Sequence, residues 1–179
     1  MFNLDQCIAD CNTAVRADRS HKLVREVVAR AVSDPTAVIA GLGEPRRAEV
    51  QKLYNSPELT ILNVIWGPLM TIMPHNHLMW AVIGVYTGRE DNIFWRRIQE
   101  NTGAKVEAAG AKSLGERDAE PLGCDIIHSV TNPLSRVTGA IHAMVATSFR
   151  CPAANGIRKR SSNGTTTWKK MCACSRQRT

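Results

Sequence analysis

Apolar residues recur at intervals of three and four positions near the start of the chain. One run comprises Leu4, Ile8, Cys11 and Val15, and a second comprises Leu23, Val27, Val28 and Ala31. This spacing places apolar side chains on one face of a helix. It predicts two helices that are separated by a break at residues 18–20.

Two shorter helices are predicted next. Asp34-Pro35 is a helix start, because proline fits the first turn, and Gly41 or Gly43 would end that helix. Pro45 opens a fourth helix that is expected to end near Tyr54. Each helix has a single apolar face, so we expect all four to pack on another part of the molecule.

From residue 59 onward the pattern changes to short segments rich in β-branched and aromatic residues. They cover residues 59–66, 69–73, 79–86, 92–97, 105–109, 125–130 and 136–142, with Gly, Pro and Asn between them. Short strands without intervening helices predict an antiparallel sandwich or barrel. We therefore expect a helical segment at 1–56, a barrel at 57–143 and an atypical, irregular basic tail at 144–179.

The net charge has a local origin. The chain of 179 residues carries a formal charge of +7, yet residues 150–179 contain eight Lys or Arg and no Asp or Glu. The part before residue 150 holds 15 basic and 16 acidic residues and is nearly neutral. Only Phe149 and Trp168 could stack on bases near or within this tail, so nucleic acid is not an expected partner.

Neither a membrane segment nor a cysteine framework is predicted. The longest apolar run is shorter than the roughly 18 residues of a membrane span, and two aspartates within residues 1–10 are unlike a signal peptide. We expect a cytoplasmic protein without membrane contact. The six cysteines include no Cys-x-x-Cys pair, which argues against a zinc ribbon or a thioredoxin-like site.

Two segments carry candidate metal ligands. In Pro74-His75-Asn76-His77 the two imidazoles are two positions apart, which on a strand places them on one face. On its own, such a pair belongs more often to a surface or a hydrogen-bonded core than to a metal site. The second segment runs from Pro121-Leu122-Gly123 through His128 to Asn132.

Together the two segments resemble the two motifs of the cupin superfamily. The first is His-x-His followed by a turn glycine, here Gly88, and the second is Pro-x-Gly followed by His-x-x-x-Asn. The resemblance implies mainly β structure with N-terminal helices, and an antiparallel cupin barrel, or double-stranded β-helix. It also implies that His75, His77 and His128 bind one divalent transition metal.

The site departs from many cupins in one respect. Those proteins place a glutamate four or five residues after the second histidine, where this chain has Ala81 and Val82. Three neutral imidazoles leave the bound ion with its full +2 charge and with open coordination positions. Such an ion favours an anionic, chelating substrate.

Within the superfamily the chain is similar to thiol dioxygenases, the group of cysteine dioxygenase and 3-mercaptopropionate dioxygenase. The matching residues are Trp66-Gly67, His75-Asn76-His77, Trp80, Ile83-Gly84, Gly88 and His128-Ser129-Val130-Thr131-Asn132. The bacterial 3-mercaptopropionate branch matches better, because no cysteine stands at 81 or 82. The resemblance implies Fe²⁺, with Zn²⁺, Ni²⁺ or Mn²⁺ as alternatives. It implies dioxygen and a small-molecule thiol or other anionic substrate as partners, for a monomer or homodimer.

Two family features differ here. The family's carboxylate-binding arginine has no counterpart near residues 54–56, although Arg46 or Arg47 could substitute. The family also has a Ser-x-His-x-Tyr motif. At its three positions this chain has Ala140, His142 and Met144, so it keeps only the histidine of the motif. The resemblance makes His142 the expected catalytic residue, next to the metal ligands and directed toward the substrate or dioxygen.

Other polar and aromatic segments have a simpler interpretation. Residues 89–92 are expected to form a polar hairpin and residues 95–97 a half-exposed strand. Trp66, Trp80 and Trp95 are expected to pack in the core.

The working hypothesis is a mononuclear non-haem iron dioxygenase that oxidises a small thiol acid to its sulfinate. The alternatives are a zinc-type hydrolase or hydratase, and a non-catalytic ligand-binding cupin.

The tail suggests a shifted reading frame. Codons compatible with residues 144–149, read one base earlier, can spell Tyr-Gly-Gly-Asp-Phe-Phe, and those for residues 154–158 can spell Glu-Trp-Asp-Pro-Glu. The first string would restore the tyrosine expected two residues after His142. We hypothesise a frameshift near Ala143, and sequencing the encoding DNA decides the matter, since codons that do not permit this second reading would exclude it.

Overall fold

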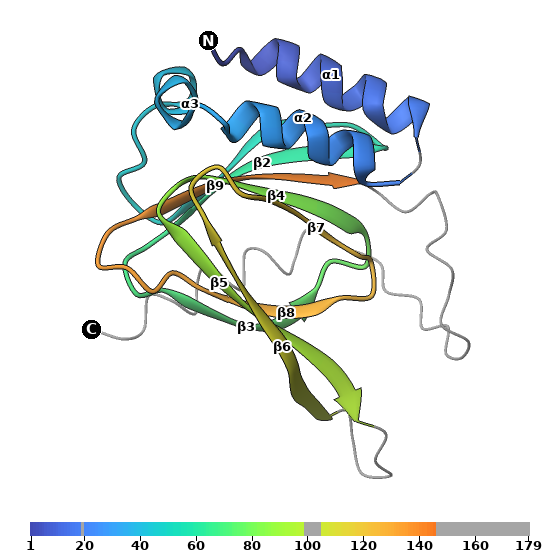
Figure 1. Cartoon of the computed structure of the whole chain (residues 1–179), viewed down its shortest axis with the longest axis vertical. Helices are drawn as coiled ribbons and strands as arrows, with labels where there is room; N and C mark the ends of the chain where they lie inside the picture. Colours follow the sequence, from blue (N-terminus) through green and yellow to red (C-terminus); the bar gives the residue numbers. More distant parts are fainter. Residues whose placement is uncertain (19, 99–104, 146–179) are drawn as a thin grey trace.

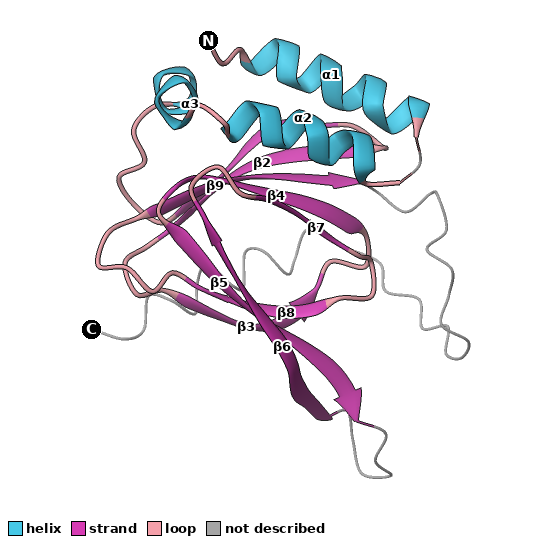
Figure 2. Cartoon of the chain, viewed as in Figure 1, coloured by secondary structure: helices cyan, strands magenta, loops and turns pink. Residues whose placement is uncertain are grey.

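A computed structural model describes residues 1–18, 20–98 and 105–145 (Figures 1 and 2). The helices of this part are α1 (Leu4–Ala17), α2 (Lys22–Val32) and α3 (Pro35–Leu42). Its strands are β1 (Glu49–Asn55), β2 (Leu59–Trp66), β3 (Thr71–Asn76), β4 (Trp80–Thr87), β5 (Arg89–Ile98), β6 (Lys105–Gly115), β7 (Ala119–Leu122), β8 (Ile127–Thr131) and β9 (Thr138–Val145). None of these three helices combines the length and apolar character that crossing a membrane requires.

The first and third helices begin at polar caps that the sequence supplies. The Asn3 side chain accepts a hydrogen bond from the Gln6 amide at 2.8 Å, and Asp34 accepts one from the Ala37 amide at 3.1 Å. Each cap satisfies a backbone donor that has no partner within the helix. The three predicted helices within residues 4–43 are therefore confirmed.

The strands form two antiparallel sheets whose order identifies the fold. One sheet has the order β1-β2-β9-β4-β7 and the other β3-β8-β5-β6. From β2 to β5, each strand lies in the other sheet from the strand before it, and the same holds from β6 to β9. This alternation is typical of a double-stranded β-helix, which is the jelly-roll arrangement of cupins. This order confirms the predicted fold class.

The predicted fourth helix is wrong. Residues 49–55 form β1, which pairs antiparallel with β2 so that Glu49 lies opposite Ile65 and Asn55 opposite Thr60. The neighbouring strand supplies hydrogen-bond partners for the backbone, and this tertiary pairing outweighs a weak local helix preference.

Strand β7 was not predicted, because Pro121 suggested a turn. Proline is tolerated there since β7 is at the edge of its sheet.

Side chains of the first sheet alternate between two apolar cores. On β4 and β9, Val82, Tyr86, Ile141 and Ala143 belong to the core under the helices. Their neighbours Ala81, Ile83, Val85, Ala140 and Met144 belong to the core between the sheets. Met144 and Val145, assigned to the tail from the sequence, are the last residues of β9, and the rest of the predicted tail lies outside the described residues.

Helix α2 packs directly on β4 (Figure 1). The contact is close because Gly84 has no side chain. A Cβ atom at this position would lie 2.4 Å from Val28 Cγ1 and 2.9 Å from Val32 Cγ1. The glycine thus sets the distance between the helical layer and the barrel.

We expect Gly84→Ala to destabilise the protein by about 1–3 kcal/mol, because the added methyl group overpacks this contact. Urea unfolding followed by far-UV circular dichroism measures the change. Gly110→Ala is the matched control, since its Cβ would come no nearer than 4.0 Å to Phe94 Cδ2. Equal stability of the two variants would contradict the role assigned to Gly84.

Candidate metal centre

The fold brings the three predicted metal ligands together. Strands β3 and β8 pair antiparallel, with His75 opposite His128, and His77 follows one residue after the end of β3. The ring centroids are 4.6 to 5.1 Å apart. One nitrogen from each residue lies within 4.8 Å of the other two. We call His75, His77 and His128 the histidine cluster.

Hydrogen bonds orient two of these rings. His75 Nδ1 is 3.0 Å from the Met73 carbonyl oxygen, and His128 Nδ1 is 2.8 Å from Asn92 Oδ1. Both oxygens can only accept, so each Nδ1 carries the proton and donates it. In this tautomer the lone pair of each ring is on Nε2, the atom that would bind a metal, and an oxygen acceptor behind the ring is typical of metal-bound histidine.

The cluster is neutral at physiological pH. Burial lowers the pKa of His75, and it lowers the pKa of His77 to about 3 and that of His128 to about 2. Neighbouring imidazoles add to the shift of His77 and His128, because two positive charges would repel one another. Neutral imidazole is the form that binds a metal, so the protein does not have to lose protons first.

The spacing and chemistry of the donors fit a divalent transition metal. His77 Nε2 and His128 Nε2 are 2.9 Å apart, which is also the length of a hydrogen bond in which one ring donates. Two nitrogens bound about 2.1 Å from one ion at right angles would be about 3.0 Å apart, and at a tetrahedral angle about 3.4 Å. The observed separation is therefore short enough for both nitrogens to bind one ion.

In the described residues no carboxylate joins the histidine cluster. Ala81 and Val82, at the positions where many cupins have glutamate, are both buried, and Ala81 faces the core between the sheets. An ion held by the cluster would therefore have only neutral protein ligands from this part of the chain.

The expected catalytic residue, His142, lies inside the barrel on β9 and is 2% exposed. Its Nε2 is 3.5 Å from Glu90 Oε1, and Trp66 Nε1 donates to the same oxygen at 2.5 Å. His142 also contributes to the lowered pKa of all three ligands, because a charge on one imidazole opposes a charge on another. Trp66 thus packs in the core, as expected, and also binds a buried carboxyl group.

Sequence reasoning missed Glu90 and Asn92, which it assigned to a polar hairpin. Gly88, with a φ of 80°, takes the chain from β4 to β5. From there Arg89 and Asp91 form an ion pair at 2.7 Å on the outer face, whereas Glu90 and Asn92 are buried. Alternation along a strand was the available signal, because it places residues 90 and 92 on the same face.

Asn132, the last residue of the second motif, has a structural role. It is fully buried, and its Nδ2 donates to the carbonyl oxygens of Gly67 and Arg136, both at 2.8 Å. Its Oδ1 accepts from the Leu134 amide and from Thr138 Oγ1, both at 3.0 Å. These bonds tie the end of β8 to the neighbouring connections.

Arg46 and Arg47 are not placed to bind a substrate at the cluster. They precede Glu49, which pairs with Ile65 near the end of β2, whereas His75 and His77 lie toward the opposite end of the barrel. The side chain of Arg47 is 83% exposed and lies 3.9 Å from Glu49.

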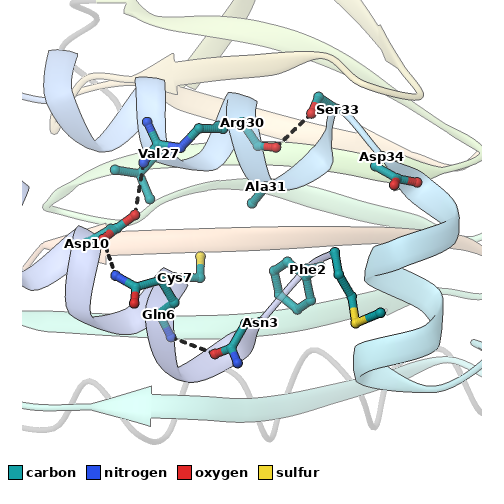
Figure 3. Close-up of a pocket in the computed structure, with 11 residues that line it drawn as sticks. Phe2, Asn3, Gln6, Cys7, Asp10, Val27, Arg30, Ala31, Ser33 and Asp34 are labelled. Atoms are coloured by element: carbon teal, nitrogen blue, oxygen red, sulfur yellow. Dashed lines mark hydrogen bonds and ion pairs between the residues drawn. The ribbon is translucent and has the colours of Figure 1, made fainter.

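A separate hollow of about 320 Å³ lies among the N-terminal residues and helices (Figure 3). Its polar side chains bind one another: Asp10 accepts from Gln6 at 2.7 Å and from Arg30 at 2.9 Å. Cys7 lines it, and a hydrogen bond with Cys11 lowers the pKa of the Cys7 thiol. Among the described residues, the group that could hold a metal is the histidine cluster and not this hollow.

The sequence matches no protein-family model and no curated protein. Among solved structures, an RmlC-like cupin from Methanocaldococcus jannaschii is 11% identical with a TM-score of 0.42, covering 57% of this chain and 84% of that one. A cupin superfamily protein from Desulfitobacterium hafniense is 12% identical with a TM-score of 0.45, covering 58% and 84%. A cupin 2 conserved barrel protein from Salinispora arenicola is 14% identical with a TM-score of 0.44, covering 56% and 77%. These similarities concern the fold and carry no information on ligand or reaction.

We expect the metal-free protein to lose stability as the pH falls below about 6.5. The folded-state pKa values of His77 and His128, about 3 and about 2, lie below the ordinary value of 6.5. The unfolded chain therefore binds more protons in this window, and the free energy of unfolding decreases until the pH approaches 3. Urea midpoints of chelator-treated protein at several pH values measure this slope.

A His77→Gln, His128→Gln double variant should have a shallower dependence on pH, whereas His21→Gln serves as a histidine control outside the cluster. An identical slope in the double variant and the parent protein would show that other groups cause the acid sensitivity.

Proposed function

We propose that this chain is a metal-dependent enzyme, a mononuclear non-haem iron dioxygenase that oxidises a small thiol acid to its sulfinate. The observation that supports this most is the convergence of three neutral imidazoles without a carboxylate ligand in the described residues. The resemblance of the sequence to thiol dioxygenases supplies the reaction class. A cytoplasmic location and a monomeric or homodimeric state belong to the same proposal.

Each ligand has a defined part in the proposal. His75, His77 and His128 would hold the ion, and the Met73 carbonyl and Asn92 would keep two of the rings in the required tautomer. Ferrous iron held there would supply the centre at which the thiolate and dioxygen react. The burial of His128 keeps bulk water away from one side of this centre.

His142 is the proposed catalytic residue. Its two ring nitrogens are buried, and neither has a hydrogen-bond partner within the described residues, although Glu90 Oε1 is 3.5 Å from Nε2. In this proposal the buried ring of His142 donates a hydrogen bond toward the substrate or dioxygen. Trp66 and Glu90 would fix its position, since Trp66 binds the carboxyl oxygen that faces the ring.

Three histidine ligands suit both iron and zinc. Metal identity is therefore the first quantity to measure. Elemental analysis of protein that was purified without added metal would distinguish an iron enzyme from a zinc-type hydrolase.

We expect His75→Ala, His77→Ala and His128→Ala each to abolish stoichiometric binding of Fe²⁺ and the thiol-dependent uptake of oxygen. Asn92→Ala should weaken metal binding by about 10- to 100-fold, because His128 loses the acceptor that orients it. Anaerobic titration with Fe²⁺ and an oxygen electrode, with cysteine and 3-mercaptopropionate as substrates, provide the measurements.

His21→Gln is the matched control and should bind the metal like the parent protein. Iron-loaded protein that consumes no oxygen with either thiol would eliminate this substrate class. Stoichiometric zinc in the purified protein, together with inactive iron-loaded protein, would favour the hydrolase or hydratase instead.

A further inference from the structure

Two cysteines of α1 form a pair of buried thiols away from the candidate metal centre. Cys7 and Cys11 are free thiols four residues apart, so they lie one above the other on the face of α1 that belongs to the core under the helices. A hydrogen bond joins their side chains. Neither thiol has a part in the proposed dioxygenase reaction, so the pair needs an explanation of its own.

The two thiols differ in their access to small molecules. Cys7 is 7% exposed and lines the hollow of about 320 Å³, whereas Cys11 is 0% exposed and is not among the lining residues. Figure 3 shows the Cys7 sulfur directed from α1 toward α2. The hollow is many times larger than the roughly 10–15 Å³ that one water-sized molecule needs. A molecule as small as hydrogen peroxide can therefore reach Cys7.

The surroundings make Cys7 the more acidic thiol of the pair. The hydrogen bond with Cys11 lowers the pKa of Cys7, and the charge of Arg30 acts in the same direction, while burial and the Asp10 carboxylate oppose them. The hydrogen bond with Cys7 and burial raise the pKa of Cys11. The thiolate is the nucleophilic form of cysteine, so attack on an oxidant starts at Cys7 and not at Cys11.

The spacing of the pair also suits a disulfide. The rise and radius of an α-helix place the Cα atoms of residues four apart about 6.2 Å from each other. Disulfides join Cα atoms that are roughly 4.4–6.8 Å apart. An accessible and acidic thiol beside a second thiol is the arrangement typical of redox-sensitive cysteines.

We propose that Cys7 is oxidised by small hydroperoxides that enter the hollow, and that Cys11 then captures the oxidised sulfur as a Cys7–Cys11 disulfide. In the first step the Cys7 thiolate attacks one peroxide oxygen and the O–O bond breaks. A sulfenic acid and hydroxide form, and the hydroxide takes up the proton that Cys7 had released. In the second step the Cys11 sulfur displaces the hydroxyl group of the sulfenic acid, which leaves with the Cys11 proton as water. The two thiols together lose two electrons, and one hydrogen peroxide is reduced to two waters.

Peptide mapping tests the proposal on the full chain, because trypsin releases residues 1–16 as one peptide that contains Cys7, Cys11 and no other cysteine. The folded protein is exposed briefly to hydrogen peroxide, with a chelator present so that iron does not catalyse side reactions, and is digested after the remaining thiols are blocked. We expect this peptide to become lighter by the mass of two hydrogen atoms, as an internal disulfide requires. A peptide that stays reduced in the folded protein, while urea-unfolded protein is oxidised under the same conditions, would overturn the proposal, since both thiols would then be inert core residues.

Two serine variants separate the roles of the thiols. In Cys11→Ser the sulfenic acid of Cys7 is not captured and should be trapped by dimedone. In Cys7→Ser the remaining Cys11 should be oxidised at least about tenfold more slowly than Cys7 is in Cys11→Ser. Equal rates in the two variants, or dimedone labelling of the parent protein without a disulfide, would overturn the assigned roles. The peptide mass of the parent protein needs no variant, so it decides the proposal even if a variant fails to fold.

Discussion

The antiparallel pairing of β3 with β8 is the constraint on which the site depends. It places His75 opposite His128, and the register shift between Ile72 and His75 adjusts which side chains of β3 face the barrel. His77 joins them because the chain turns toward β4 just after β3 ends. A one-residue change in this register would move His75 to the other face of the sheet and would separate the donors.

The barrel supports this register from both sides. Helices α1 and α2 cover the outer face of the first sheet, where Gly84 lets α2 approach β4 closely. The space between the sheets is lined mostly by apolar side chains, and Asn92, His128 and His142 are among the few buried polar residues. Such surroundings keep the imidazoles neutral, because burial penalises their charged form. They also strengthen any electrostatic interaction with a ligand.

Much of the local structure followed from residue spacing. The three confirmed helices and β2 have strong signals: apolar residues at intervals of three and four, cap residues, and a run of β-branched side chains. The segment from Pro45 to Tyr54 has no such signal, since its strand conformation depends on hydrogen bonds to β2. β7 is short and contains Pro121, so only its pairing with β4 distinguishes it from a turn.

By itself, the sequence determined the helical start, the antiparallel β fold and the identity of the three histidines, because these depend on local periodicity and on motif spacing. Only the tertiary structure decided that His75, His77 and His128 converge and that Glu90 and Asn92 face the same interior. Convergence depends on strand register and on the turn at Gly88, which bring together residues up to 53 positions apart. No local pattern fixes such distances, since they result from packing two sheets against each other.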